Sequence, residues 1–338
     1  MTRHSGARIA IAVLAVTPGL AVGGCGIPVR GNGGEPLSPR PAVLTAAVTE
    51  IVDRYVQVSN AASARRSTAL LRSVEVGSSL AIDTAIYRAD RALDPGDKSK
   101  SRPFGYRPEA TFVPRLAGYP RWFAIRARPT HPPANPALLV FVQRRAGQPW
   151  LQTALIDLGP QSALPELAYD GHGNVIAVPV ADESDLVATP SVVAEAHAEH
   201  LTGGKRPASS PRLAADAWTT ELVEAARTDA KQLAPARVTS RYQPTGQPMY
   251  ALRTADGGAL VVYAMRRSFD ARLGSGSPVW RLAGMYAALA GTEALPARTL
   301  HVEWLYQWLV QVPPAGAESA EVRVIARSGG LTAVAGRD

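Results

Sequence analysis

Two histidines three positions apart could present both imidazole rings to one metal ion. His197 and His200 lie on a predicted helix with Glu199 between them, and this spacing places the two rings on one helix face. A metal site would need a third ligand from elsewhere, such as His172 or His301. The same spacing is typical of a solvated polar helix face, so we expect no metal ion and no other cofactor.

The standard nucleotide-binding and hydrolytic motifs are missing from the chain. No P-loop, no Gly-x-Gly-x-x-Gly, no His-Glu-x-x-His and no Gly-x-Ser-x-Gly pattern occurs in its 338 residues. These patterns carry the phosphate-binding, metal-binding and nucleophilic chemistry of several common enzyme classes. The sequence therefore identifies no catalytic residue.

Cys25 is the single cysteine, which excludes an internal disulfide and a multi-cysteine metal site. The segment before it has the three parts of an export signal: basic Arg3 and Arg8, the apolar run of residues 9–16, and small residues after a Pro-Gly break. The apolar run is too short to cross a bilayer, which takes ~20 residues. We therefore expect the chain to be exported.

The end of this signal resembles the lipobox of bacterial lipoproteins. Residues 20–25 read Leu-Ala-Val-Gly-Gly-Cys, with small residues before the cysteine. The resemblance implies cleavage between Gly24 and Cys25, a diacylglycerol on the Cys25 sulfur, and a lipid anchor on the outer face of the cell membrane. Ordinary signal cleavage after residue 23 is the alternative, because residues 21–23 also fit a small-x-small site.

A change in composition after residue 41 marks the start of the folded region. Residues 26–41 hold four glycines and four prolines, so we expect residues 25–41 to form a tether. Beyond the tether, helices precede strands twice, in residues 42–180 and again in residues 181–338. We therefore predict two α+β domains with these bounds, each with helices packed on a curved antiparallel sheet.

The predicted helices have apolar residues at helical spacing, and the strands are apolar or alternating runs. The helices are residues 44–58, ended by Asn60, and residues 70–74, 80–93, 191–201 and 213–233. The strands are residues 110–113, 122–128, 137–142, 150–157, 238–242, 249–254, 259–266, 299–312 and 320–327. Glycines at 329 and 330 are expected to turn the chain into a short final strand. Asp83 is expected on the polar side of its helix.

Helices that precede an antiparallel sheet resemble the NTF2-like, or cystatin-like, architecture. In that architecture a cone beneath the helices can hold a small molecule, and some relatives use a buried Asp and Tyr. The resemblance implies pocket candidates in both halves, although an aromatic stripe is more often core. These candidates are Asp53, Tyr55, Tyr87 and Trp122 in the first half, and Trp218, Tyr263 and Trp304 in the second.

A second resemblance rests on residues 250–263, which read Tyr-Ala-Leu-Arg-Thr-Ala-Asp-Gly-Gly-Ala-Leu-Val-Val-Tyr. Together with the lipobox, this phrase resembles an uncharacterised family of actinobacterial lipoproteins. The family implies a domain of unknown function and no activity. The phrase itself predicts a strand, a turn and a second strand.

The densest aromatic stretch lies in the strand of residues 299–312. Trp304, Tyr306 and Trp308 alternate there, so a strand would place all three side chains on one face. That face is either a packed inner surface or an exposed strip that binds a partner. We expect the core, because exposed aromatic strips are uncommon.

The positive charge is unevenly distributed. The chain has a net charge of +8, yet residues 42–180 hold 16 basic and 11 acidic residues, whereas residues 181–338 hold 16 of each. An anchor would keep the basic half near anionic lipid, which attracts basic groups. The candidate contacts lie in one loop: Lys98, Lys100, Arg102 and Arg107. Scattered solvated arginine is the alternative, and no nucleic-acid module is visible.

These observations favour an exported, lipid-anchored envelope lipoprotein with a binding or structural role. Its partner would be an envelope protein, a polymer or a small ligand. The alternative is a hydrolase or isomerase that uses a cone pocket. Two ionisable groups that converge in a deep pocket would favour the enzyme, whereas a pocket closed by Trp and Leu side chains would favour the binding protein.

Overall fold

A computed structural model describes residues 38–96, 102–131, 135–160, 162–181, 185–203, 210–274 and 278–338. Gly24, Cys25, Lys98 and Lys100 lie outside the described residues. Residues Ser38–Asp338 form one compact unit. The class is α+β, as predicted, with helices and antiparallel sheets.

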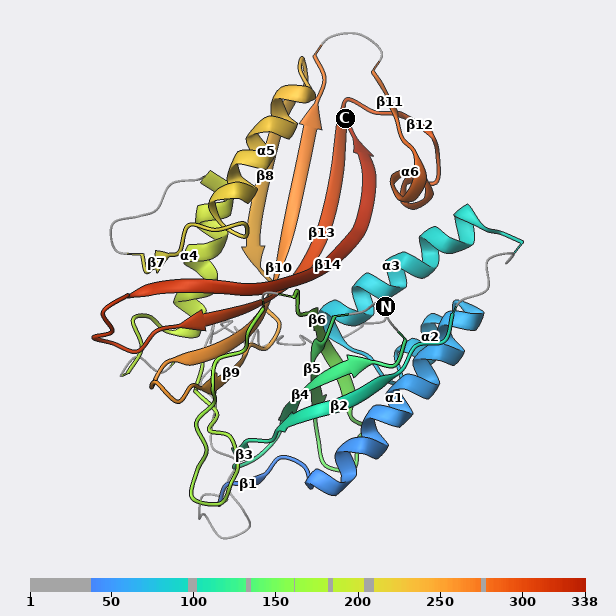
Figure 1. Ribbon diagram of the computed structural model, residues 1–338. Helices are drawn as coiled ribbons and strands as arrows, with labels where there is room; N and C mark the ends of the chain where they lie inside the picture. Colours follow the sequence, from blue (N-terminus) through green and yellow to red (C-terminus); the bar gives the residue numbers. More distant parts are fainter. Residues whose placement is uncertain are drawn as a thin grey trace, which may run out of the picture. The chain divides into compact units, whose positions relative to one another are not determined.

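The first sheet is the antiparallel meander that the sequence predicts (Figure 1). Its order is β2-β4-β5-β6, so strands that follow one another in the chain are hydrogen-bonded neighbours. The apolar run of β5 is buried at every position except the last. The strands are β2 (Tyr106–Phe112), β4 (Arg121–Pro129), β5 (Ala137–Gln143) and β6 (Leu151–Asp157).

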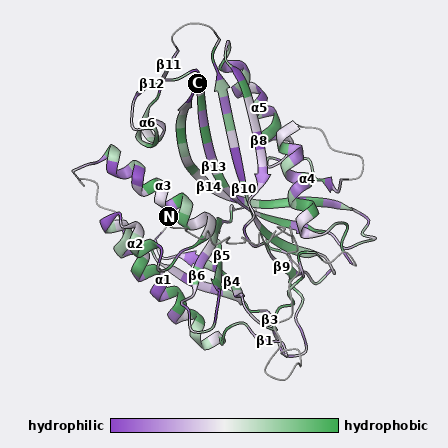
Figure 2. Cartoon of the chain, turned by 180° about the vertical axis from the view of Figure 1, so that it is seen from behind, coloured by the Kyte–Doolittle hydropathy of each residue, from purple (hydrophilic) through white to green (hydrophobic). Residues whose placement is uncertain are grey.

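Three helices precede this sheet: α1 (Thr45–Arg65), α2 (Thr68–Leu71) and α3 (Gly77–Leu93). Helix α1 places Val48, Val52 and Tyr55 against Phe123 and Phe141 of the sheet. Figure 2 shows hydrophobic and hydrophilic residues alternating along this helix, as expected for a helix with one buried face. Among the described residues, no helix is both long and apolar enough to cross a bilayer.

The predicted end of the first helix is wrong. Helix α1 continues past Asn60 to Arg65, and Arg66 ends it in the left-handed region at φ 47°. The Asn60 amide pairs with the backbone of Phe104, donating to its carbonyl oxygen at 2.7 Å and accepting from its N–H at 2.9 Å. Because this tertiary pairing uses the side chain, Asn60 does not compete for the helix backbone.

The second sheet has the order β7-β14-β13-β10-β8, with β9 paired to the start of β10. Strands β10 and β13 pair along all fourteen residues, and β13 has the predicted bounds. Strands β10 and β14 run further than predicted. The strands are β7 (Arg212–Leu213), β8 (Arg237–Pro244), β9 (Tyr250–Arg253), β10 (Ala259–Arg272), β13 (Thr299–Val312) and β14 (Glu321–Arg337).

Helices α4 (Pro190–Gly203) and α5 (Thr220–Gln232) lie beside β8 and β10 (Figure 1). The predicted start of α5 at residue 213 is wrong, because residues 212–213 pair in parallel with β14. The Thr219 hydroxyl donates to the Ala214 carbonyl at 2.6 Å, and Asp216 Oδ1 accepts from the Trp218 N–H at 2.8 Å. These side-chain bonds hold a turn that delays the helix.

The predicted turn at Gly329 and Gly330 is also wrong, because β14 continues through both glycines without interruption. A Cβ atom at Gly330 would lie 2.9 Å from Cγ2 of Ile82, so the missing side chain lets α3 approach the strand closely. The two glycines therefore mark close packing. Five short elements were not predicted: β1 (Arg40–Pro41), β3 (Arg115–Leu116), β11 (Val279–Arg281), α6 (Gly284–Ala290) and β12 (Ala294–Pro296).

The hydrophobic clusters cross the predicted domain boundary. One cluster joins Trp122 and Leu138 of the first sheet to Tyr250, Leu260 and Leu309 of the second. The Trp122 and Tyr250 rings lie 5.1 Å apart between centroids. The division at residue 180 and the NTF2-like likeness stay predictions, and limited proteolysis of residues 157–189 tests the former.

Candidate ligand-binding cavity

A cavity of about 140 Å³ lies where the two halves of the chain meet. Its wall combines α1, α3 and β6 with β13 and β14, so it includes residues more than 250 positions apart in sequence. Several polar side chains line it together with a few apolar ones. The lining residues are Tyr55, Ser79, Ile82, Asp83, Gln152, Leu155, Gln307, Ser328 and Gly329.

Helix α3 supplies three of these residues from one face. Ser79, Ile82 and Asp83 are spaced three and four positions apart, which places them side by side on a helix. The start of α3 is held from the second half, because the Ser78 N–H donates to Gln247 Oε1 at 2.8 Å. Asp83 therefore points to the cavity, and its predicted place on the solvated side of the helix is wrong.

Strand β6 is an edge strand whose outer backbone groups are satisfied by side chains of the second sheet. The Leu155 N–H donates to Gln307 Oε1 at 2.8 Å, and the Asp157 N–H donates to Ser328 Oγ at 2.8 Å. Gln307 Nε2 donates in turn to the hydroxyls of Ser78 and Ser79, each at 2.9 Å. These bonds fix one wall of the cavity and use the hydrogen-bonding capacity of Gln307.

Glu75 lies behind this wall, between α2 and α3. Its side chain is 1% exposed, and neither carboxyl oxygen has a hydrogen-bond partner among the described residues. A two-residue bridge ties it to β6, since the Gln152 N–H donates to the Val74 carbonyl at 2.7 Å and the Val76 N–H to the Gln152 carbonyl at 3.0 Å. The backbone therefore holds Glu75 and Gln152 next to each other.

Gln152 brings a buried amide group without a protein partner to the wall of the cavity. Its side chain is 1% exposed and lines the cavity, yet neither Oε1 nor Nε2 has a partner among the described residues. Ser59 Oγ is buried and without a partner as well. Buried polar atoms in folded proteins are nearly always hydrogen-bonded to protein or water. These atoms are expected to bond to water or to a ligand.

Burial dominates the electrostatics of the site. It raises the pKa of Glu75 well above the usual range, and the neighbouring Asp83 raises the pKa of Glu75 further. Burial also raises the pKa of Asp83 and that of Tyr55. Although the chain contains 32 arginines, neither carboxyl forms an ion pair within the described residues. The pair of carboxyls therefore lacks a positive partner.

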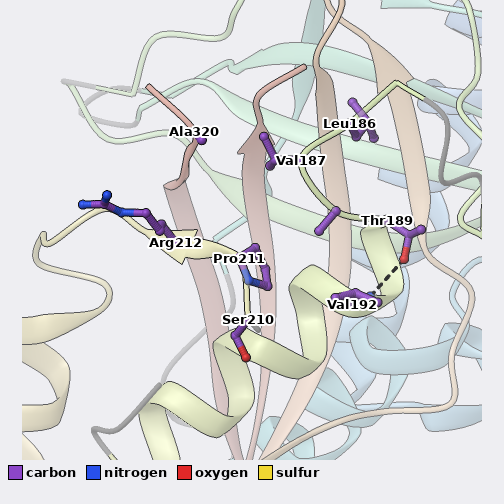
Figure 3. Close-up of a pocket in the computed structure, with 9 residues that line it drawn as sticks. Leu186, Val187, Thr189, Val192, Ser210, Pro211, Arg212 and Ala320 are labelled. Carbon is purple, nitrogen blue, oxygen red and sulfur yellow. Dashed lines mark hydrogen bonds between the residues drawn. The ribbon is translucent and has the colours of Figure 1, made fainter. Parts of the chain in front are cut away.

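A second hollow, shown in Figure 3, is larger, but Arg212 is the one ionisable side chain among the described residues that line it. It measures about 470 Å³, and Leu186, Val187 and Val192 form part of its wall. Thr189 Oγ1 accepts from the Val192 N–H at 3.3 Å at the start of α4, and Arg212 pairs with Glu321 at 3.1 Å. The side chains of Thr189 and Arg212 thus already have partners in the fold.

The histidines predicted as alternative metal ligands do not converge. His197 is fully buried, its Nδ1 lies 2.8 Å from the Tyr263 hydroxyl, and burial lowers its pKa to about 3. His172 lies on an exposed turn, and His301 lies between Asp270 and Glu303. No group of three or more metal-ligating side chains occurs within the described ranges.

The aromatic residues of β13 divide between core and surface. Trp308 is fully buried, whereas Trp304 and Tyr306 are half-buried. Arg267 lies over the Trp304 ring at 4.9 Å from its centroid, and Arg327 lies over Tyr306 at 4.5 Å. The expectation of a core strand thus holds fully only for Trp308.

Of the pocket candidates from the NTF2-like resemblance, one lies at the cavity and others lie in the core or on the surface. Tyr55 lines the cavity, whereas Tyr87 pairs with the Ser63 hydroxyl at 2.8 Å. Asp53 is exposed, and Trp122 and Tyr263 belong to the core. Arg327 lies over the Trp218 ring. Four residues at or beside the cavity were not predicted as site residues: Glu75, Asp83, Gln152 and Gln307. The one available signal was Gln307, a glutamine within the apolar run of β13.

Two of the four candidate lipid contacts lie within the described residues. Arg102 precedes β2, whereas Arg107 lies on this strand, so its predicted place in the loop is wrong. Both side chains are exposed. Their exposure leaves them accessible to a surface or to solvent.

Comparison with known proteins identifies related chains in actinobacteria. The profile of a family described as "Domain of unknown function (DUF8094)" matches residues 39–336. An uncharacterised lipoprotein of Streptomyces coelicolor is 28% identical over 231 residues, which are 66% of this chain and 64% of that protein. A second from the same organism is 26% identical over 296 residues, 86% of this chain and 85% of that one. No solved structure gives a significant match.

An uncharacterised lipoprotein of Streptomyces avermitilis is also similar. It is 26% identical over 302 residues, which cover 88% of this chain and 87% of the relative. The similarity to the first relative thus spans less than two thirds of that protein, whereas the other two align over most of their length.

Proposed function

Because the chain belongs to the DUF8094 family and resembles proteins named lipoproteins, we propose that it is a lipoprotein of the cell envelope that binds a small ligand. Cys25 would carry the lipid anchor, after cleavage between Gly24 and Cys25, and hold the protein on the outer face of the membrane. Two acyl chains give stable anchoring where one is marginal.

The unpartnered amide of Gln152 carries the binding proposal. Leaving a buried polar group without a partner costs about 1–3 kcal/mol, and an apolar residue at this position would avoid that cost. The amide lies at the wall of a cavity larger than a single water needs. A ligand that bonds to the Gln152 amide would account for both features.

An acid–base enzyme is the second candidate, and it rests on Asp83. Burial raises the pKa of Asp83 toward neutrality, where a general base works best, and Asp83 reaches the cavity. The second carboxyl, Glu75, does not line the cavity and so could act only through Asp83. Since only one ionisable carboxyl of the pair faces the cavity, binding without catalysis is the stronger proposal.

The basic loop supports a further part of this proposal, contact with anionic lipid. Arg102 and Arg107 are exposed, as such contacts require, and Lys98 and Lys100 complete the predicted set. No nucleic acid is proposed as a partner, and an envelope protein is the alternative occupant of this surface.

Thermal melting of the full chain tests the binding role. The chain is melted with small neutral, cationic and anionic molecules at equal ionic strength. We expect at least one class to raise the melting temperature in a saturable way, and Gln152→Met to remove that rise. If no class stabilises the chain, the binding role is wrong. Turnover that Asp83→Asn abolishes would instead establish the enzyme.

A further inference from the structure

The wall of the cavity offers hydrogen-bond acceptors to a ligand. Asp83 contributes its carboxyl group and Gln152 contributes an unpartnered Oε1, whereas Glu75 lies behind the wall next to Asp83. Gln307 cannot supply donors to a ligand without giving up Ser78 and Ser79. A ligand that bonds to the Asp83 carboxyl and the Gln152 Oε1 must bring N–H or O–H donors.

Among the described residues, no basic side chain lines the cavity. The titratable groups on which the two carboxyls act are Tyr55 of α1, Tyr87 of α3 and Tyr106 of β2. Asp90 of α3 also acts on Tyr87, and Asp157 of β6 also acts on Tyr106. All of them are acidic or phenolic. A buried carboxylate without a counter-charge is costly, so a cation in the cavity would be favourable.

The size and walls of the cavity favour an organic cation over a bare ion. One water needs roughly 10–15 Å³ of such space, whereas this cavity measures about 140 Å³. Ile82 and Leu155 add apolar surface beside the polar atoms. A primary ammonium group has three donors and no acceptor, which suits the Asp83 carboxyl and the Gln152 Oε1 at the wall.

We propose that the cavity binds a small primary ammonium compound, with its charged group at Asp83 and its hydrocarbon part against Ile82 and Leu155. This inference rests on the proposed binding function and names the ligand class. It also implies proton release: the raised pKa values of Glu75 and Asp83 mean that the empty pair retains a proton, and a bound cation favours the ionised form.

Three probes of equal length separate charge from shape: n-propylammonium chloride, 1-propanol and sodium propionate. Each is titrated calorimetrically into the full chain in detergent at constant ionic strength. We expect n-propylammonium to bind at least tenfold more tightly than the other two. Asp83→Asn should weaken that binding at least tenfold, whereas the exposed control Asp53→Asn should not change it.

A measurement on the unaltered chain guards against a variant that fails to fold. Titration with n-propylammonium in buffers of different ionisation enthalpy should show proton release, and affinity should rise between pH 5 and pH 8. If 1-propanol or propionate binds equally well, or if no proton is released, the ammonium assignment is wrong while the binding role stands. If neither these probes nor the wider set binds, both proposals fail.

Discussion

The Nε2 atom of Gln307 lies 2.9 Å from the Ser78 hydroxyl, which joins two residues 229 positions apart. Gln307 also donates to Ser79 and accepts from the Leu155 N–H, so one side chain links β13 to both α3 and β6. In an apolar strand, this polar residue specifies how the second sheet meets the first.

Gln307→Leu should therefore destabilise the protein. Leucine has a similar size but leaves the Leu155 N–H and the Ser79 hydroxyl without the bonds that Gln307 makes, at about 1–3 kcal/mol for each group that water does not reach. The Ser78 hydroxyl keeps its bond to the Thr153 carbonyl at 3.3 Å. Urea unfolding measures the loss. Gln311→Leu, at a half-buried position of the same strand, is the control and should change stability little. An equal loss in both variants would contradict the linking role.

Gln152→Met should stabilise the empty protein. Methionine fills the same space without the two unpartnered amide atoms, so we expect a gain of about 1–3 kcal/mol in the free energy of unfolding. The same variant should lose ligand stabilisation. Gln148→Met at an exposed position serves as the control. A less stable Gln152→Met protein would indicate that the amide is satisfied in solution.

The bounds of β13 follow from a local pattern, whereas the cavity does not. Strand β13 could be predicted because its apolar run needs no partner to be recognised. Glu75 precedes α3 and Asp83 lies on it, and only the packing of α3 against β6 and β14 forms the cavity beside them. Gln152 and Gln307 have no local motif. Gly330 shows the same limit, because a glycine that permits close packing looks like a turn signal.

Gly330→Ala should destabilise the contact between α3 and β14. Its Cβ would lie 2.9 Å from Ile82 Cγ2, so either the helix or the strand must shift, at about 1–3 kcal/mol. Thermal melting measures the cost. Gly246→Ala, whose Cβ would meet open space, is the control and should melt near the native temperature. Gly330→Ala should cost less in an Ile82→Ala background, because alanine lacks the Cγ2 atom that the new Cβ would meet.

The raised pKa of Glu75 predicts how stability depends on pH. The folded state holds the Glu75 proton to higher pH than the unfolded chain, whose value is about 4.3. Between those two values the folded state binds more protons, so this group's contribution to stability falls as pH rises. Glu75→Gln should remove that fall and raise the melting temperature at pH 8. Exposed Glu50→Gln should leave the profile unchanged, and an unaltered profile in Glu75→Gln would disprove the assignment.

The basic loop predicts weak, salt-sensitive binding to anionic membranes. A chain that starts at residue 26 should bind vesicles containing anionic lipid, because each basic group at the surface contributes ~1 kcal/mol and salt screens the attraction. Co-sedimentation with neutral and anionic vesicles, at low and high salt, measures this binding. Neutralising Lys98, Lys100, Arg102 and Arg107 should abolish it. Neutralising four exposed arginines of the second half should not: Arg237, Arg241, Arg281 and Arg323. An equal loss of vesicle binding in the two variants would show that the net charge of the chain, and not the position of these residues, determines the binding. Equally strong binding to neutral vesicles would exclude an electrostatic contact.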